Sequence, residues 1–367
     1  MILIARLVLT AITMIVPLLA VTPEVRSPLA VCTDAEIAAA NAALPAYTPV
    51  GTGDFVRTQG RVFVVNGQPL AIRGINYYPQ HYPWRRFLTE TNLAEVAVEL
   101  DLLQRHGINA LRLFLWHDAL FQCPGSGAVP QPEAFARLDG VMALATARGM
   151  YVNLTLHDLP DLSDYPLYDD PVHTRAQRAF LVERYRDEPA IFAWDVRNEG
   201  DIDYGSNNAA NIRFPREQVL AWAEAATAHV RSLDANHLVT AGWFTDQEAT
   251  ISFVDFVSFH HWGDAASLIG RIEATYAATD KPMLLQEFGY STQRMSEDDQ
   301  ARTIGEIIHF AGQYELAGWM IWTAFDFSID RTCYPSPCVS PDNAEHYFGL
   351  WRLGYETKPA VSIIELP

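Results

Sequence analysis

Short apolar segments alternate with amphipathic segments of helical length along most of this chain. Eight of the apolar segments have the length and composition of strands: 70–76, 109–115, 151–157, 191–199, 238–242, 254–260, 282–287 and 318–324. Helices are expected between them at 91–106, 133–148, 172–186, 215–233, 264–279 and 297–314. This alternation predicts a single (β/α)8 TIM barrel. A doubly wound sheet is the competing architecture, but no glycine-rich phosphate fingerprint follows the first strand.

The N-terminal region divides into two segments ahead of the barrel. Residues 1–26 have one arginine, Arg6, before a long apolar run, which is typical of a secretory signal peptide. An uncleaved membrane anchor is the alternative. Residues 27–53 form an N-terminal extension with a short alanine-rich helix, and residues 54–367 form the barrel domain. We therefore expect a secreted or extracytoplasmic protein, or, in the alternative, one anchored to the membrane by its N-terminal segment.

The four cysteines fit an exported protein with two disulfides. Cys333 and Cys338 are close enough in sequence to pair, which leaves Cys32 and Cys123. Composition constrains the partner as well. A net charge of −18 argues against nucleic acid or an anionic membrane, because polyphosphate would be repelled. A neutral substrate is compatible with it, and no obligate protein partner is evident.

Alternation of side chains along a strand sorts the residues of each strand into two faces. In 151–157, Asn153, Thr155 and His157 share the face expected to point into the barrel. In 109–115, Arg112 lies on the face that also carries Trp116 just beyond the strand. An arginine inside a barrel requires a carboxylate partner.

Polar residues also end the sixth and seventh strands. His260 and Trp262 share one face there, while Glu287 is expected on the face that carries Met283 and Leu285. Barrel active sites sit at the C-terminal ends of the strands. Glu199 and Glu287, at the ends of the fourth and seventh strands, are therefore the catalytic candidates, because glycoside hydrolysis needs two carboxylates flanking the bond.

Four motifs carry a resemblance to a known family. They are "RGIN" at 73–76, "RNEG" at 197–200, "LLQEFGY" at 284–290 and "GWMIWTAFDF" at 318–327. Together they resemble clan A of the glycoside hydrolases, most closely family 5, the cellulase and mannanase family. The resemblance covers roughly residues 60 to 365 and implies a retaining β-glycosidase that needs no cofactor.

The resemblance implies roles for individual residues. Glu199 corresponds to the acid/base and Glu287 to the nucleophile. Asn198 would bind the sugar 2-hydroxyl, and Arg112 and His260 would support the site. Trp322 would form the floor of the sugar-binding subsite, and the peptide bond between Trp322 and Thr323 would be cis.

Two features depart from the family pattern. The family has a tyrosine two residues after the histidine of the sixth strand, and this chain has Trp262. Strict alternation also turns Asn198 away from the face of Glu199, so the strand is expected to break or bulge there.

Other candidates have two readings. His157 is either a sugar contact or a hydrogen-bonding residue that lines the barrel, and Trp116 and Trp243 are either sugar platforms or rim packing. A metal site at His157 or His260 is disfavoured, because adjacent residues face opposite ways and no third ligand has suitable spacing. The aspartate-rich segment 157–171 lacks the spacing of a calcium loop, so a solvated loop is favoured.

The sequence therefore predicts an exported, retaining β-glycosidase acting on β-mannan, β-glucan or derived oligosaccharides, in exo or endo mode. A non-catalytic carbohydrate-binding protein on the same barrel is the alternative. The two carboxyl groups are expected about 5–5.5 Å apart, and repulsion from Glu287 with partial burial is expected to raise the pKa of Glu199. The long segment 326–351 is expected to form a wall of the substrate cleft.

Overall fold

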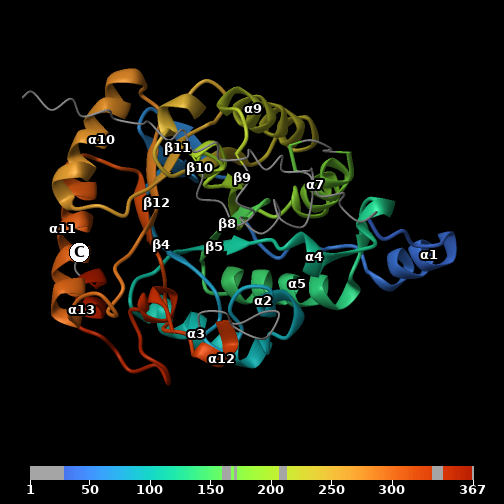
Figure 1. Ribbon diagram of the computed structural model, residues 1–367, viewed down its shortest axis with the longest axis horizontal. Coiled ribbons are helices and arrows are strands. Elements are labelled where there is room, and N and C mark those ends of the chain that lie inside the picture. Colours follow the sequence, from blue (N-terminus) through green and yellow to red (C-terminus); the bar gives the residue numbers. More distant parts are fainter. Residues whose placement is uncertain (1–28, 159–166, 169–171, 206–212, 333–341, 366–367) are drawn as a thin grey trace, which may run out of the picture.

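A closed barrel of eight parallel strands forms the centre of the protein (Figure 1). The structure, a computed structural model, describes residues 29–158, 167–168, 172–205, 213–332 and 342–365. The strands follow the spatial order β10-β11-β12-β13-β4-β5-β8-β9. Their bounds are β4 Ile72–Asn76, β5 Ala110–Phe114, β8 Tyr151–Thr155, β9 Ile191–Asn198, β10 Leu238–Trp243, β11 Val257–His260, β12 Met283–Phe288 and β13 Gly318–Ile321. Each of the eight predicted strand segments contributes one of them, so the predicted fold is confirmed.

Helices form the outer layer around the barrel (Figure 1). The six predicted ones are α3 Leu93–Arg105, α5 Pro132–Thr146, α7 Val172–Tyr185, α9 Arg216–Leu233, α10 Ala265–Ala278 and α11 Glu297–Gln313, and α13 Ala360–Ile364 packs beside α11. Side-chain caps fix the residues at which several of these helices begin. At the start of α11, the Ser296 side chain accepts a hydrogen bond from the Asp299 amide. Shorter elements occupy the loops: α2 Arg86–Thr89, α4 His117–Leu120, α8 Ile202–Gly205, α12 Ile329–Thr332, β6 Phe121–Gln122, β7 Val129–Pro130, and the 3-10 turns Pro124–Ser126, Gln247–Thr250 and Ala344–Tyr347.

A small antiparallel sheet of β1 Arg57–Gln59, β2 Val62–Val65 and β3 Gln68–Leu70 covers the N-terminal end of the barrel. Asn66 and Gly67 make its tight turn, both with positive φ. From β2, the ring of Phe63 packs against Phe192 and Phe256, which lie in β9 and just before β11. An apolar cluster thus closes the N-terminal end of the barrel, and the polar residues of the interior lie toward the C-terminal end.

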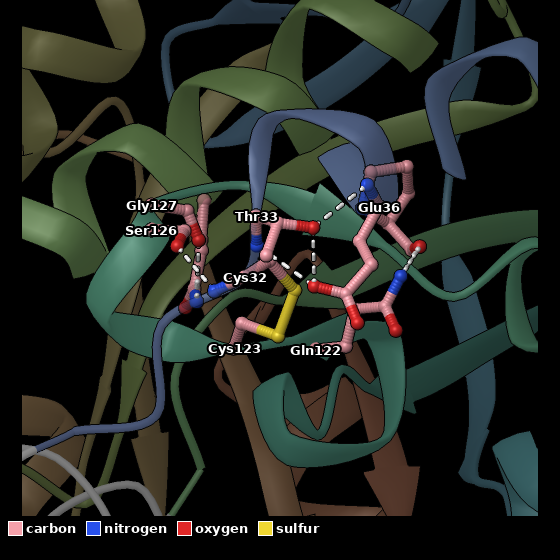
Figure 2. The surroundings of a disulfide bond; sticks show 9 residues. Cys32, Thr33, Glu36, Gln122, Cys123, Ser126 and Gly127 are labelled. Carbon is pink, nitrogen blue, oxygen red and sulfur yellow. Dashed lines mark hydrogen bonds between the residues drawn. A yellow bond between two sulfur atoms is a disulfide. The ribbon is translucent and has the colours of Figure 1, made fainter. Parts of the chain in front are cut away.

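The N-terminal extension is fixed to the barrel domain by a disulfide. Helix α1, Asp34–Ala43, begins with a capping box between Thr33 and Glu36. Just before it, Cys32 is bonded to Cys123 in the loop after β6, and the Cys32 amide donates to Ser126 (Figure 2). The structure therefore pairs the two cysteines, Cys32 and Cys123, whose pairing the sequence left open.

Some predictions concern residues outside the described part of the chain. They include the leader at 1–26, the Cys333–Cys338 pairing and most of the aspartate-rich segment 157–171. Within the described residues, no helix combines the length and apolar character that crossing a membrane requires.

Candidate active site

Strand β9 contains an extra residue just before its carboxyl end. Asp195 pairs with Thr240 of β10, and the next pair is Asn198 with Gly242, so β9 advances three residues while β10 advances two. The bulge reverses the alternation and turns Asn198 into the barrel mouth. Glu199 follows in the left-handed conformation, with φ of 48°, and its amide donates to the Gly242 carbonyl. The strand therefore breaks where sequence alternation required it, and Asn198 and Glu199 both face the cavity.

A second bulge lies in β12. Phe259 of β11 pairs with Leu285, but the next residue, His260, pairs with Glu287. The expectation that Glu287 shares a face with Met283 and Leu285 is wrong, because those two pack in the core between barrel and helices. The extra residue turns Glu287 to the barrel interior, where it joins the carboxyl ends of the other strands.

Arg112 is the centre of the polar network beneath the cavity. Its side chain is fully buried, and it donates hydrogen bonds to Thr155, Asn76, Glu287, Asp195 and Asn198 at 2.7–3.0 Å. Arg112 was expected to have a carboxylate partner, and it has two: Glu287 at 2.7 Å and Asp195 at 2.8 Å. Burial disfavours its charge, but these two carboxylates outweigh burial and raise the pKa of Arg112.

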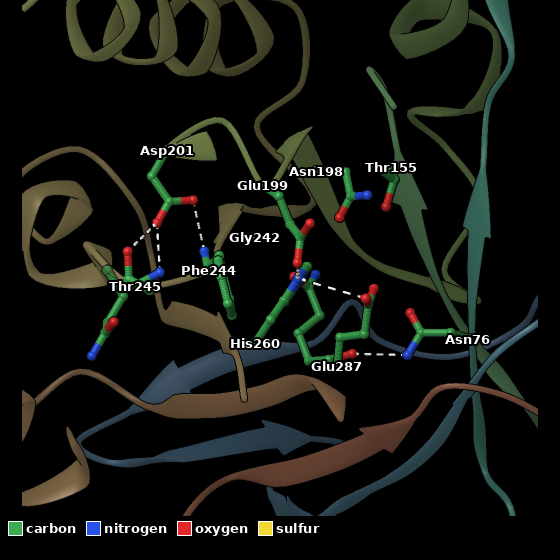
Figure 3. Close-up of polar contacts among 12 residues, drawn as sticks. Asn76, Thr155, Asn198, Glu199, Asp201, Gly242, Phe244, Thr245, His260 and Glu287 are labelled. Carbon is green, nitrogen blue, oxygen red and sulfur yellow. Dashed lines mark hydrogen bonds and ion pairs between the residues drawn. The ribbon is translucent and has the colours of Figure 1, made fainter. Parts of the chain in front are cut away.

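Glu199, His260 and Glu287 converge at the carboxyl ends of their strands (Figure 3). His260 Nδ1 lies 2.9 Å from Glu199 Oε1 and 3.8 Å from Glu287 Oε1. One oxygen of each glutamate lies within 4.8 Å of the other. This spacing fits the roughly 5–5.5 Å between the carboxyl groups of retaining glycosidases and is shorter than the roughly 6.5–9.5 Å of inverting ones.

The protonation preferences of the two glutamates differ from the expectation. Burial raises the pKa of Glu287 to about 7, although His260 and Arg112 oppose this. For Glu199, burial also favours the protonated form, but the hydrogen bond and charge of His260 outweigh it and the pKa is lowered. The predicted rise for Glu199 is therefore wrong. Burial alone would lower the pKa of His260, but the negative charges of Glu287 and Glu199 outweigh burial, and the pKa is raised. The His260 imidazole therefore competes with Glu199 for the proton that they share.

A cavity of about 470 Å³ opens above the two carboxylates. Its lining residues are Trp84, Phe114, Trp116, Asp158, Asn198, Glu199, Trp262, Glu287, Trp322 and Glu345. The predicted binding residues Asn198, Trp116, Trp262 and Trp322 are among them. Arg112 and His260 lie directly beneath it as partners of the glutamates.

Aromatic side chains form much of the cavity wall. The rings of Trp84 and Trp322 stack with centroids 5.7 Å apart and an interplanar angle of 14°. The peptide bond between Trp322 and Thr323 is cis, as the resemblance implied. Trp116 donates its indole N–H to the Tyr78 hydroxyl at 2.9 Å, which holds the ring at the cavity edge.

Trp262 replaces the hydroxyl that the family pattern places on the sixth strand. Its side chain donates toward Glu199 and adds to the lowering of that pKa, after His260. The indole ring also meets Phe348 edge-on, with centroids 5.6 Å apart. The substitution thus places an N–H donor at Glu199.

Two of the ambiguous candidates lie outside the cavity. His157 is fully buried, stacks on His117 with centroids 4.5 Å apart and meets Trp222. Of its two interpretations, the structure therefore favours the buried hydrogen-bonding residue over the sugar contact. Its ring turns toward α4 and α9 because the chain leaves the strand at Thr155. Trp243 is also fully buried and packs against Gly200, which supports the packing interpretation for that residue.

Sequence reasoning missed several residues of the site. Asp158 accepts a hydrogen bond from Asn198 Nδ2 at 2.9 Å and lines the cavity. Glu345 accepts from Trp322 Nε1 at 3.1 Å, and burial raises its pKa. Asp195 had a readable signal, because it is a charged residue in the middle of an apolar strand. For Glu345 the only signal was the length of the segment after the eighth strand, which was expected to reach the cleft.

In the described part of the chain, Glu199, His260 and Glu287 are close enough to hold a metal ion. However, the Arg112 guanidinium already supplies a positive charge 2.7 Å from Glu287, and His260 Nδ1 is engaged with Glu199. A divalent cation among these groups would be repelled by Arg112 and would displace both contacts. The arrangement is suited to proton transfer and nucleophilic attack.

Comparison with known families supports this chemistry. The model of a family described as Cellulase (glycosyl hydrolase family 5) matches residues 65–328. A mannan endo-1,4-beta-mannosidase A from Podospora anserina is 27% identical over an alignment of 307 positions, and the match covers 69% of this chain and 78% of the relative. A mannan endo-1,4-beta-mannosidase F from Aspergillus clavatus is 29% identical over 53% of this chain, and the match spans only 48% of that longer protein.

Solved structures show the same fold at low sequence identity. A variant of the GH5_18 enzyme from Streptomyces cattleya, in complex with Manβ1-4GlcNAc, has a TM-score of 0.66 at 19% identity and covers 81% of this chain and 79% of its own. The endo-1,4-beta-mannanase from Rhizomucor miehei has a TM-score of 0.62 at 17% identity, over 85% of this chain and 99% of its own.

Proposed function

Given that this chain belongs to glycosyl hydrolase family 5, the cellulase family, we propose that it hydrolyses β-mannosidic bonds in mannan or in short mannose-containing oligosaccharides. Family membership and the mannanase relatives make it a mannanase-like, retaining O-glycosyl hydrolase. The observation that carries the catalytic assignment is the pair of carboxylates, Glu199 and Glu287, with oxygens within 4.8 Å of each other in one cavity.

The proposed reaction is a double displacement. Glu287 attacks the anomeric carbon and forms a glycosyl-enzyme ester, while Glu199 donates a proton to the departing oxygen. Water then attacks the same carbon, Glu199 accepts its proton, and the ester bond to Glu287 breaks. The Arg112 contact at 2.7 Å supports this role for Glu287, because it stabilises the ionised nucleophile between turnovers.

The cavity wall supports binding of a sugar ring next to Glu287. Trp322 provides a flat apolar face, on which the apolar face of a pyranose can stack. Asn198 is held between Arg112 and Asp158, so its amide is positioned for a sugar hydroxyl. Glu345, which accepts from the Trp322 indole N–H, adds a carboxylate acceptor to the cavity lining.

The preference for mannose is drawn from the relatives. Curated relatives from fungi and a plant are named mannan endo-1,4-beta-mannosidases, and two structural neighbours were solved with Manβ1-4GlcNAc. The test is an activity panel on the purified protein with β-mannan, mannooligosaccharides, Manβ1-4GlcNAc, β-glucan and aryl β-glycosides. We expect hydrolysis of mannosides above glucosides. Activity on β-glucan alone would overturn the mannoside assignment, and inactivity on every β-glycoside would favour a carbohydrate-binding role.

We also propose export, with residues 1–26 as the leader, 27–53 as an extension and 54–367 as the catalytic domain. The Cys32–Cys123 disulfide supports this, because such bonds persist in oxidising compartments. Mass spectrometry of the protein from the extracytoplasmic fraction measures the mature N-terminus. A start between residues 20 and 31 is expected, and an intact Met1 would instead support the anchored form.

A further inference from the structure

Gln286 is a fully buried amide that links the barrel interior to His260. It lies in β12 directly before Glu287, and the bulge in this strand turns both side chains inward. Gln286 Nε2 donates to Asn153 Oδ1 at 2.8 Å and to Asp195 Oδ2 at 3.3 Å. Gln286 Oε1 lies 3.3 Å from His260 Nε2.

The neighbours of Gln286 fix which way its amide points. Asn153 donates its own Nδ2 to the Ala193 carbonyl at 3.1 Å, so its Oδ1 faces Gln286 as an acceptor. Asp195 accepts from Arg112 at 2.8 Å and is an acceptor as a carboxylate. Both neighbours therefore require the Gln286 NH₂ group, and its Oε1 is left to accept from His260.

This orientation determines the tautomer of His260. A carbonyl oxygen can only accept, so His260 Nε2 carries hydrogen whether the ring is neutral or charged. In the neutral ring Nδ1 is then a bare lone pair, 2.9 Å from Glu199 Oε1. A hydrogen bond can form there only when the two groups hold one further proton between them, either as imidazolium with carboxylate or as neutral ring with carboxylic acid.

We propose that Gln286 is a positioning residue that keeps the catalytic proton on the Glu199–His260 pair by holding His260 in its Nε2–H tautomer. The inference rests on the proposed function, in which Glu199 protonates the leaving group. The two protonated forms of the pair differ only by the position of the proton along the bond from His260 Nδ1 to Glu199 Oε1. His260 thus stores the proton that the lowered pKa of Glu199 would otherwise release.

The proton balances over one turnover. In the first step the bond from Glu287 to the anomeric carbon forms and the glycosidic C–O bond breaks, while Glu199 gives its proton to the leaving oxygen. Glu199 is then a carboxylate beside a neutral His260. In the second step water adds to the same carbon, the ester bond to Glu287 breaks, and the water proton returns to the pair.

The backbone of β10 makes room for this contact. A Cβ atom at Gly242 would lie 2.3 Å from Gln286 Oε1 and 3.0 Å from His260 Nε2, so a larger residue there would separate them. Charged groups approach the pair from several elements. They are Asp195 from β9, Glu287 from β12, Arg112 from β5, Asp158 after β8, and Arg271 from α10, which donates to the His260 carbonyl.

Nitrogen-15 NMR of the histidine side chains tests the tautomer without any substrate. In the wild-type protein, His260, assigned by its loss in His260→Gln, should carry hydrogen on Nε2 across the accessible pH range. In Gln286→Met, a near-isosteric change without an acceptor, neutral His260 is free to carry hydrogen on Nδ1 and to donate it to the Glu199 carboxylate. A wild-type ring with hydrogen on Nδ1 alone would overturn the proposal, even if the variant failed to fold.

Kinetics provide the second readout. Without the Gln286 acceptor, the neutral His260 can donate from Nδ1 to the Glu199 carboxylate, which stabilises the deprotonated Glu199–His260 pair. The alkaline limb of the kcat/KM profile for mannobiose should therefore move to lower pH by about one unit. At pH values above the limb, this shift is a roughly tenfold loss of activity. With 2,4-dinitrophenyl β-mannoside, whose leaving group needs no proton, that shift should disappear.

Thr240→Val serves as the matched control. Thr240 is a fully buried barrel residue whose hydroxyl bonds to Phe256 and Ser258 rather than to His260. An equal limb shift in Thr240→Val, or an unchanged limb in Gln286→Met, would show that Gln286 does not position the proton. A wild-type protein inactive on both mannosides would instead refute the proposed function, while the NMR result would still decide the tautomer.

Discussion

Replacing Arg112 with methionine should destabilise the protein strongly and more so as the pH rises. Arg112 is fully buried and stands between two carboxylates, Glu287 at 2.7 Å and Asp195 at 2.8 Å. Removing one partner of a buried ion pair leaves charge without compensation, which costs roughly 3–5 kcal/mol of unfolding free energy. The oxygens of Thr155, Asn76 and Asn198 would lose a donor as well.

The pH dependence follows from the sign of the pKa changes. Burial already raises the pKa of Glu287 to about 7 with Arg112 in place, and Arg112 is one of the groups that oppose this rise. Without Arg112 the pKa of Glu287 in the folded state moves further above its unfolded value. A carboxyl group shifted this way destabilises the fold at pH values above its unfolded pKa. The loss should therefore be small near pH 4 and largest above pH 7.

Chemical denaturation at several pH values measures this loss directly. Arg302→Met is the matched control, because Arg302 also contacts two carboxylates, Asp299 and Glu306, but on the exposed surface of α11. Its effect should be within the error of the measurement and should not grow with pH. Equal losses for the two variants, or an Arg112→Met loss that shrinks as pH rises, would refute the argument that Arg112 compensates buried charge.

Three further predictions concern other parts of the molecule. The acid limb of the kcat/KM profile should lie near pH 7, because Glu287 must be ionised to attack and burial raises its pKa to about 7; a limb near pH 4 would contradict this. Replacing Cys32 and Cys123 with serine should lower the unfolding free energy by up to about 4–5 kcal/mol, because the disulfide closes a loop between residues 91 positions apart. Guanidinium denaturation measures this loss, and kcat should be unchanged. Glu345→Ala should lower kcat/KM by roughly ten- to hundredfold if its carboxylate accepts from a sugar hydroxyl, while Asp342→Asn on the same segment, which does not line the cavity, should not.

The architecture followed from the sequence because burial on both faces leaves a strong local signal. All eight strands of the barrel lie within or close to the predicted segments, and the polar residues at their ends do meet at one mouth. The bulge at Asn198 was also predictable, because the family motif and strict alternation conflicted there.

The bulge at Glu287 was not predictable in the same way. It depends on the register between β11 and β12, and no residue in "PMLLQE" signals a change of register. The direction of the Glu199 pKa shift was likewise hidden, because it depends on the 2.9 Å contact with His260, sixty-one positions away in the chain. His157 was misplaced because the strand ends at Thr155, two residues earlier than the predicted segment.

The proposed function depends on Glu287 as the nucleophile and Glu199 as the acid/base of a retaining hydrolase. Trapping with 2,4-dinitrophenyl 2-deoxy-2-fluoro-β-mannoside tests it most directly, because the fluorine slows breakdown of the glycosyl-enzyme more than its formation. Peptide mapping of the inactivated protein should place one fluorosugar on Glu287, and the Glu199→Ala variant should still be labelled because this leaving group needs no proton. A label on Glu199 or Glu345, or turnover of a dinitrophenyl mannoside without any covalent species and with inverted product, would refute these two roles.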